Sequence, residues 1–167
     1  MKVLGIDPSL RGTGYAVVRF ENGAYAAVTY GKIPNPATRA VPSCLLEIEE
    51  VLTAVIREWE PDEAAIESTI YVQSYQTAIK LGAARGAAMI ATARAGLSLH
   101  EYAPKRIKQS VVGRGGAGKH QVAFMIRSLL GLTTTPSPDA ADALAIALTH
   151  IQSRTAAIRS ALPENGR

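Results

Sequence analysis

Cysteine, aspartate and long apolar runs are all scarce in this sequence, and each scarcity narrows what the chain can be. A single cysteine, Cys44, excludes a disulfide framework and a zinc cluster built from cysteines. No uninterrupted apolar run approaches the roughly 18 residues of a membrane span, and "MKVLGID" lacks the charged region and cleavage site of a signal peptide. We therefore expect a cytoplasmic protein without membrane association, folded as one domain over 1–157 with a flexible tail at 158–167.

Charge is unevenly distributed along the chain, whose formal net charge is +4. Residues 41–67 include eight acidic side chains and one basic side chain, Arg57. Residues 80–127 include nine basic side chains and one acidic side chain, Glu101. Such a basic segment suits the phosphate backbone of a nucleic acid, although a solvated charged face would show the same pattern. The candidate nucleic-acid contacts in this segment are Arg85, Lys105, Lys108, Arg114 and Lys119.

Hydrophobic spacing predicts an α/β domain with a five-stranded sheet. Stretches at 3–7, 13–20 and 24–33 indicate a three-stranded antiparallel meander. An amphipathic helix is expected at 45–59, and the apolar run at 63–68 then forms a buried strand parallel to the first, because a helical crossover joins parallel strands. The other expected elements are a helix at 74–95, a strand at 97–103, and helices at 104–112, 119–131 and 136–157.

Aspartate is much rarer than glutamate, four residues against ten, so its positions are informative. Asp7 ends the first expected strand, and Glu67 ends the strand expected beside it. Asp139 and Asp142 are three residues apart and share one face of the last helix. Taken singly, these residues could be a turn former, a surface glutamate or a charge that complements a helix dipole. Together they would repel one another, so they predict a site for Mg²⁺, with Mn²⁺ as the alternative.

The stretch "GRGGAGKH" at 113–120 nearly matches a phosphate-binding P-loop, in which a Ser or Thr after the lysine holds Mg²⁺. His120 stands in that place, and a P-loop also needs its glycines between a core strand and a helix. We therefore interpret the stretch as a flexible basic loop before a helix, which presents Arg114 and Lys119 to a DNA phosphate.

In combination these motifs resemble the RuvC family of Holliday junction resolvases, which are ribonuclease H-like nucleases. The resemblance runs through "GIDPSLRGTGYAVV", "AAIES", "AIKLGAARGAA", "EYAPKRIKQSVVGRGGAGKHQV" and "DAADALAIALTH", and it reaches about His150. Each motif is weak alone, whereas their occurrence in this order is specific. The resemblance implies a ribonuclease H-like fold with a mixed five-stranded sheet flanked by helices, in agreement with the predicted elements.

The resemblance also implies an activity, a cofactor and partners. A homodimer would bind a four-way DNA junction and nick two strands of like polarity symmetrically, leaving 5′-phosphate and 3′-hydroxyl ends. Lys108 and Lys119 match basic residues that approach the DNA near the scissile phosphate. The branch-migration proteins RuvA and RuvB are expected partners, and two Mg²⁺ ions per subunit are expected. The catalytic metal ligands carried over from the family are Asp7, Glu67, Asp139 and Asp142.

The chain departs from the family pattern at two places. Ser9 stands where family members commonly have glycine, a change at a turn that should leave Asp7 in place. Many members carry an aromatic residue shortly after the catalytic glutamate that stacks against junction bases. Tyr71 and Tyr75 are the candidates here, and either could instead be ordinary loop packing.

Three other functions compete with junction resolution. A sugar-kinase or chaperone-type ATPase shares the strand meander, but such enzymes need two domains of this kind and 167 residues supply one. A ribonuclease H-like nuclease that acts on RNA is the second alternative, and "DAADALAIALTH" with "IKQSVVG" favours the resolvase. The third alternative is a non-catalytic protein that binds junctions through its basic surface, and the intact set of carboxylates argues against it.

Overall fold

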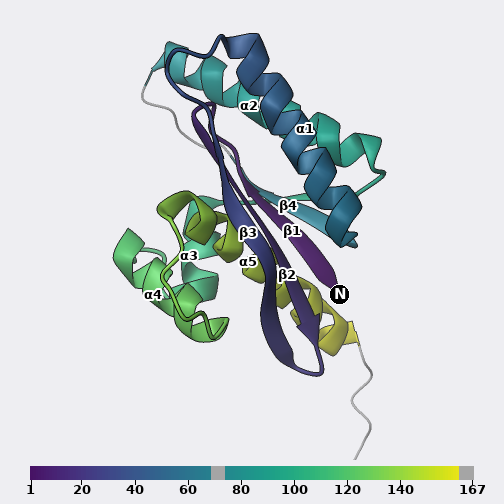
Figure 1. The fold of residues 1–167 in the computed structure, drawn as a ribbon. Coiled ribbons are helices and arrows are strands. Elements are labelled where there is room, and N and C mark those ends of the chain that lie inside the picture. The colour runs from purple at the N-terminus through teal and green to yellow at the C-terminus, as the bar shows by residue number, and fades with distance from the viewer. Residues whose placement is uncertain (69–73, 162–167) are drawn as a thin grey trace, which may run out of the picture.

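A mixed five-stranded sheet with the strand order β3-β2-β1-β4-β5 lies at the centre of the molecule (Figure 1). The computed structural model describes residues 1–68 and 74–161. The strands are β1 (Lys2–Asp7), β2 (Gly12–Glu21), β3 (Ala24–Pro34), β4 (Glu63–Glu67) and β5 (Leu99–Tyr102). The first three form an antiparallel meander, and β4 and β5 extend the sheet from β1 in parallel. This is the α/β sheet that the sequence predicts.

The helices of the described part of the chain are α1 (Val41–Trp59), α2 (Tyr75–Arg94), α3 (Pro104–Val112), α4 (Lys119–Leu129) and α5 (Pro138–Ala161). Residues that favour helix ends mark the start of α2 and both ends of α3. At the start of α2, the hydroxyl of Ser74 accepts a hydrogen bond from the backbone N–H of Thr77. Helix α3 begins at Pro104, and Gly113 ends it with a φ of 79°, in the left-handed region that favours glycine.

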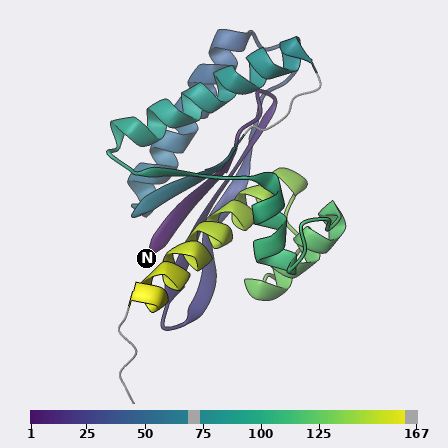
Figure 2. The ribbon, with the colours of Figure 1, turned by 180° about the vertical axis from the view of Figure 1, so that it is seen from behind.

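Helices cover both faces of the sheet, with α1 and α2 on one face and α3, α4 and α5 on the other (Figures 1 and 2). Side chains alternate between the two faces along a strand. Leu4 of β1 therefore packs with α1 and α2, whereas Val3 packs with α5. By the same alternation Asp7 lies on the α5 face of β1. Glu67 lies on the α5 face of β4, since Ala65 packs on that side.

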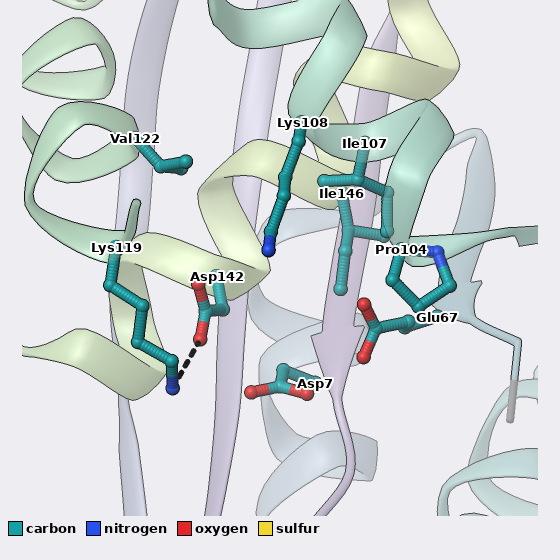
Figure 3. Close-up of a pocket in the computed structure, with 9 residues that line it drawn as sticks. All are labelled: Asp7, Glu67, Pro104, Ile107, Lys108, Lys119, Val122, Asp142 and Ile146. Carbon is teal, nitrogen blue, oxygen red and sulfur yellow. Dashed lines mark ion pairs between the residues drawn. The ribbon is translucent and has the colours of Figure 1, made fainter. Parts of the chain in front are cut away.

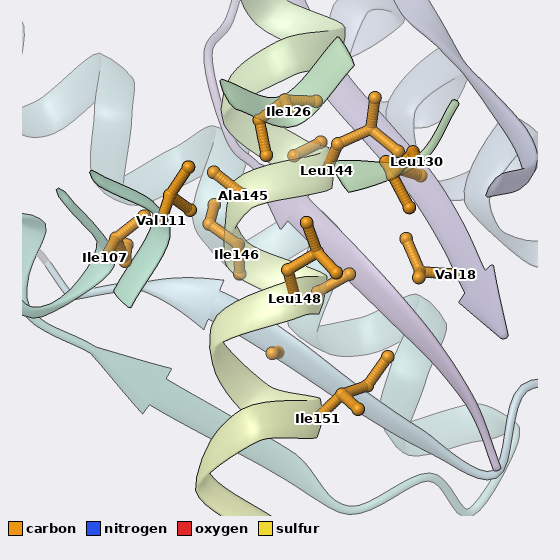
Figure 4. Close-up of a cluster of buried hydrophobic side chains, with 14 of the residues drawn as sticks. Val18, Ile107, Val111, Ile126, Leu130, Leu144, Ala145, Ile146, Leu148 and Ile151 are labelled. Atoms are coloured by element: carbon orange, nitrogen blue, oxygen red, sulfur yellow. The ribbon is translucent and has the colours of Figure 1, made fainter. Parts of the chain in front are cut away.

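Helix α5 forms the buried centre of the second layer (Figure 4). Every residue from 143 to 151 is buried. Leu144, Ile146, Leu148 and Ile151 pack in one apolar cluster with side chains of the sheet and of α3 and α4. Because α5 is held from several directions, its first turns have a well-defined position relative to the ends of the strands.

Two glycines allow α5 to lie directly on the sheet. A Cβ atom added at Gly5 of β1 would overlap the carbonyl oxygen of Ala143, and one added at Gly14 of β2 would overlap the carbonyl oxygen of Asp139. The backbone of the helix therefore meets the backbone of two strands. This close approach carries Asp139 and Asp142 toward the end of β1, where Asp7 lies.

The end of α5 differs from the expectation. The helix continues to Ala161, four residues into the segment 158–167 that the sequence suggests as a tail. No glycine or proline interrupts the chain between Asp139 and Ala161, so nothing local stops the helix before that point. The division into a domain over 1–157 and a tail stays a prediction. None of the helices in the described ranges is long and apolar enough to cross a membrane.

Candidate active site

Acidic residues from three elements and two lysines line one pocket of about 220 Å³ (Figure 3). The pocket lies where β1 and β4 end and α5 begins. Three of the four predicted carboxylates and both predicted family lysines therefore meet, although they come from five elements. The charged lining residues are Asp7 of β1, Glu67 of β4, Lys108 of α3, Lys119 of α4 and Asp142 of α5, and the other lining residues are Pro104, Ile107, Val122 and Ile146.

Asp7 is partly buried and lies near the three other predicted carboxylates, Glu67, Asp139 and Asp142. Burial is the main cause that raises its pKa from 3.8 to about 7. The charges of Asp142, Glu67 and Asp139 raise the pKa further, in that order of strength, and Lys119 lowers it. In the absence of a cation the site therefore favours a proton on Asp7 near neutral pH.

Burial also raises the pKa values of Glu67 and Asp142. Asp142 raises the pKa of Glu67, and Lys108 and Lys119 oppose both shifts. The Nζ atom of Lys119 lies 4.0 Å from Oδ2 of Asp142, and its side chain is 81% exposed (Figure 3). Lys119 is thus tethered loosely at the rim, where it can turn from a carboxylate of the protein to an incoming phosphate.

Asp139 is the predicted carboxylate that does not line the pocket. Its Oδ2 atom lies 2.7 Å from Nζ of Lys32 on β3, in an ion pair in which both side chains are partly exposed. Sequence analysis did not identify Lys32. In the sheet Lys32 pairs with Gly14, and Gly14 lies against the backbone of Asp139. This contact depends on strand register and tertiary packing, which no local sequence motif indicates.

Arg85, a predicted DNA contact, forms its hydrogen bond and ion pair within the protein. Its Nη1 donates a hydrogen bond of 2.7 Å to the carbonyl oxygen of Glu67, and its Nη2 lies 2.5 Å from Oε1 of Glu101. The side chain is 15% exposed, so little of the guanidinium remains for a phosphate. These contacts hold Arg85 against the end of β4, on which Glu67 lies, and its role as a DNA contact stays a prediction.

The other predicted DNA contacts lie outside the pocket. Arg114 is an exposed residue of the loop between α3 and α4, and the exposed Lys105 lies against Gly115 of that loop. This loop joins two helices rather than a core strand and a helix, which confirms that "GRGGAGKH" is not a P-loop. Tyr75, the first residue of α2, is 90% exposed, and Tyr71 lies outside the described residues.

The donor atoms of the pocket fit a hard divalent cation. The ligands available are carboxylate oxygens, which Mg²⁺ and Mn²⁺ prefer. Burial, and then the negative charge of the neighbouring carboxylates, raises the pKa of Asp7, and a cation would neutralise that charge. These carboxylates are nevertheless spread around the pocket. Within the described residues, a tighter group of potential ligands, with ligand atoms all within 4.8 Å, is formed by Glu63, His100 and His150.

The sheet order and the acidic pocket at the strand ends define a nuclease of the ribonuclease H-like class. The family model for "Crossover junction endodeoxyribonuclease RuvC" matches residues 3–150. The chain belongs to this RuvC family of endonucleases, which resolve Holliday junctions.

Individual relatives agree with the family model. The crossover junction endodeoxyribonuclease RuvC of Akkermansia muciniphila is 54% identical over 151 residues, which cover 90% of each chain. That of Syntrophomonas wolfei is 44% identical, over 92% of this chain and 90% of the relative. The solved structure of Thermus thermophilus RuvC in complex with a Holliday junction substrate matches with a TM-score of 0.87 and 32% identity, over 93% of this chain and 96% of the other.

Proposed function

We propose that this chain resolves four-way DNA junctions by metal-dependent nicking of two strands of like polarity. The observation that carries the proposal is the pocket in which Asp7, Glu67 and Asp142 meet Lys108 and Lys119. A relative of known structure, Thermus thermophilus RuvC, is in complex with a Holliday junction substrate. Substrate specificity for a junction over linear duplex or RNA is part of the proposal.

We assign the metal-binding role to Asp7, Glu67, Asp139 and Asp142, with two Mg²⁺ ions per subunit and Mn²⁺ as the alternative. When bound, the ions activate the attacking water and stabilise the leaving oxygen of the phosphodiester. The carboxylates fix the position of this charge relative to the scissile phosphate. Asp7 contributes as a carboxylate, so it must give up the proton that burial favours in the metal-free protein.

Lys108 and Lys119 neutralise charge on the phosphate. Lys108 extends between Asp142 and Glu67, and Lys119 approaches Asp142 from another side of the pocket (Figure 3). A positive group that meets the phosphate where negative charge develops stabilises the transition state more than the ground state. We therefore expect Lys119→Ala to reduce cleavage more than it reduces junction binding. Arg114 and Lys105 extend the basic surface beside this position, which makes binding decrease steeply with added salt.

The exposed face of α2 supports the proposal of a homodimer. Tyr75, Ile79, Met89 and Ile90 are 90%, 72%, 41% and 51% exposed, and they recur at helical spacing on the side opposite the buried Ala84 and Ala88. Gly82 and Gly86 lie on the same stripe, and a Cβ at either would meet nothing within 4 Å. A helix of a second subunit could thus approach α2 closely.

We also propose, from the family resemblance, that RuvA and RuvB are partners that deliver the junction to the dimer. The resemblance further suggests that Tyr75 or Tyr71 stacks on the bases of the junction. The location of the protein in the cytoplasm, where the chromosome lies, is also part of the proposal.

Incubation of the protein with labelled four-way junctions, linear duplexes and RNA, each with and without Mg²⁺, tests the proposal. We expect paired nicks in the junction only, and only when Mg²⁺ is present. Asp7→Asn should bind the junction with unchanged affinity and fail to cut it. Cleavage by this variant at the wild-type rate would contradict the metal-site assignment. Preferential cleavage of RNA would favour the second nuclease class, and binding without any cleavage by the wild type would favour a non-catalytic junction-binding protein.

A further inference from the structure

A second group of potential metal ligands lies on the same face of the sheet as the active-site pocket. Glu63 begins β4, His100 lies on β5 and His150 lies on α5. One ligand atom of each lies within 4.8 Å of the ligand atoms of the other two. Helix α5 advances by eight residues, or about 12 Å, between Asp142 and His150, so this group is separate from the carboxylate pocket.

His150 is held in a fixed orientation. Its side chain is completely buried, and its Nδ1 atom lies 2.8 Å from the hydroxyl of Tyr102. Its Nε2 atom lies 2.5 Å from Oε2 of Glu63. Histidine ligands of metals are typically oriented in this way, by a hydrogen bond at the ring nitrogen that does not bind the ion. Tyr102 thus leaves Nε2 of His150 directed at the carboxylate.

One ring nitrogen of His100 lacks a hydrogen-bond partner in the part of the chain that the structure describes. Its Nε2 atom is buried and makes no hydrogen bond with the described residues. The ring centroids of His100 and His150 are 4.4 Å apart, so the two imidazoles lie against each other. A buried polar atom without a partner is destabilising, and a bound ion or water is one of the ordinary reasons for which it persists.

Glu63 divides its two oxygens between two partners. Oε1 lies 3.0 Å from Nη2 of Arg154, whose side chain is half exposed, and Oε2 faces His150. An ion bound at Oε2 would leave the ion pair with Arg154 in place. Arg154 would then orient the carboxylate from outside the site, as Tyr102 orients the imidazole.

We propose that Glu63, His100 and His150 form a binding site for a transition-metal ion, with Zn²⁺ as the favoured ion. Two imidazoles and one carboxylate are a ligand set that suits Zn²⁺, whereas Mg²⁺ prefers oxygen ligands. As the ion binds Nε2, the single proton of the neutral His150 ring moves to Nδ1, where the Tyr102 oxygen accepts it in a hydrogen bond. Nε2 of His150 and Oε2 of Glu63 must separate by about 1 Å to reach the spacing of tetrahedral ligands, and a water completes the fourth position.

Such an ion would join β4, β5 and α5. Helix α5 also carries Asp139 and Asp142, and β4 also carries Glu67. The bound ion would therefore stabilise the elements that position the catalytic carboxylates, without contacting the DNA. Because it binds the folded protein, it should also raise the thermal unfolding temperature.

Titration of the full chain with Zn²⁺ by isothermal calorimetry, in excess Mg²⁺ to occupy the carboxylate pocket, tests the proposal. We expect one Zn²⁺ per chain, and Co²⁺ should give the absorption bands of a tetrahedral complex. His100→Gln, which removes one ligand, should weaken Zn²⁺ binding by more than about tenfold, and Tyr102→Phe by about tenfold. His120→Gln is the matched control, since His120 is exposed and outside the group, and its affinity should equal that of the wild type.

Two results would overturn the proposal: a wild-type protein that shows no saturable Zn²⁺ binding, or a His100→Gln variant that binds as tightly as the wild type. In either case Glu63 and His150 form a hydrogen-bonded pair, and the ring of His100 packs against it without an ion. If circular dichroism shows that His100→Gln is unfolded, Glu63→Gln replaces it, with the same expected loss. The readout does not depend on nuclease activity, so its failure is distinguishable from a failure of the proposed function.

Discussion

Asp7 is the residue whose ionisation couples most directly to stability. Its pKa rises from 3.8 to about 7 on folding, because of burial and the neighbouring carboxylates. Between these values the folded state holds a proton that the unfolded chain has released, so the free energy of unfolding falls as pH rises through this range. Asp7→Asn has no such proton. In EDTA we expect its stability advantage over the wild type to grow by on the order of 2 kcal/mol between about pH 5 and pH 8.

Urea denaturation at both pH values measures this difference. Excess Mg²⁺ is the control, because a cation that binds the ionised carboxylates should stabilise the wild type and reverse the order at the higher pH. An advantage of Asp7→Asn that is equal at the two pH values would show that Asp7 ionises normally in the folded protein.

Lys32 is a second single residue with a testable effect, because its ammonium group competes with a metal ion for Asp139, a predicted metal ligand. Its ammonium group lies 2.7 Å from Oδ2 of Asp139, and the side chains are 43% and 30% exposed. Partly exposed ion pairs contribute about 0.2–1 kcal/mol. Lys32→Met should therefore tighten Mn²⁺ binding about two- to fivefold in the absence of DNA, as measured by electron paramagnetic resonance. Lys80→Met, which removes the same charge from α2, should leave the affinity unchanged. Weaker Mn²⁺ binding by Lys32→Met would mean that Lys32 orders Asp139 instead.

At the scale of the elements, the contact of α5 with the sheet places the carboxylates. Gly14→Ala would put a Cβ into the carbonyl oxygen of Asp139, so the helix or β2 must shift. We expect a loss of about 1–3 kcal/mol in the free energy of unfolding, as for other overpacked sites. Junction cleavage should decrease more than stability alone explains, since Asp139 and Asp142 move relative to Asp7. In Gly116→Ala the added Cβ meets nothing within 4 Å, which makes this variant the control for stability. Full cleavage by Gly14→Ala would show that the site tolerates the shift.

The elements were more predictable than their contacts. Pro104 and Gly113 mark the ends of α3 in the sequence itself, and the alternation of apolar residues identifies the strands. The grouping of Asp142 with Asp7 was a hypothesis from the scarcity and placement of the carboxylates, and the family resemblance supplied the full ligand set. The side-chain orientation of Arg85 could not be predicted, because it depends on an ion pair with Glu101 of β5, 16 residues later in the chain. The ion pair of Lys32 with Asp139 could not be predicted either, because it depends on strand register. Side chains that join separate elements leave no periodic signal.

At the scale of the whole molecule, a four-way junction offers two equivalent strands, so symmetric nicking needs two active sites held together. The apolar stripe on α2 is the surface that we propose for this contact. Ile79, 72% exposed at its centre, would be buried in the dimer. A glutamate there would place a charge in an apolar interface, which is strongly unfavourable without a partner.

Ile79→Glu is therefore expected to be a monomer in sedimentation analysis under conditions in which the wild type is a dimer. It should keep its fold and lose paired nicking of the junction. Ile158→Glu is the matched control, because Ile158 is a 59% exposed isoleucine near the end of α5, and this variant should remain a dimer. A wild-type protein that sediments as a monomer would contradict the homodimer. A dimer of Ile79→Glu would move the interface to another surface, because a buried glutamate pair at the centre of the stripe would repel.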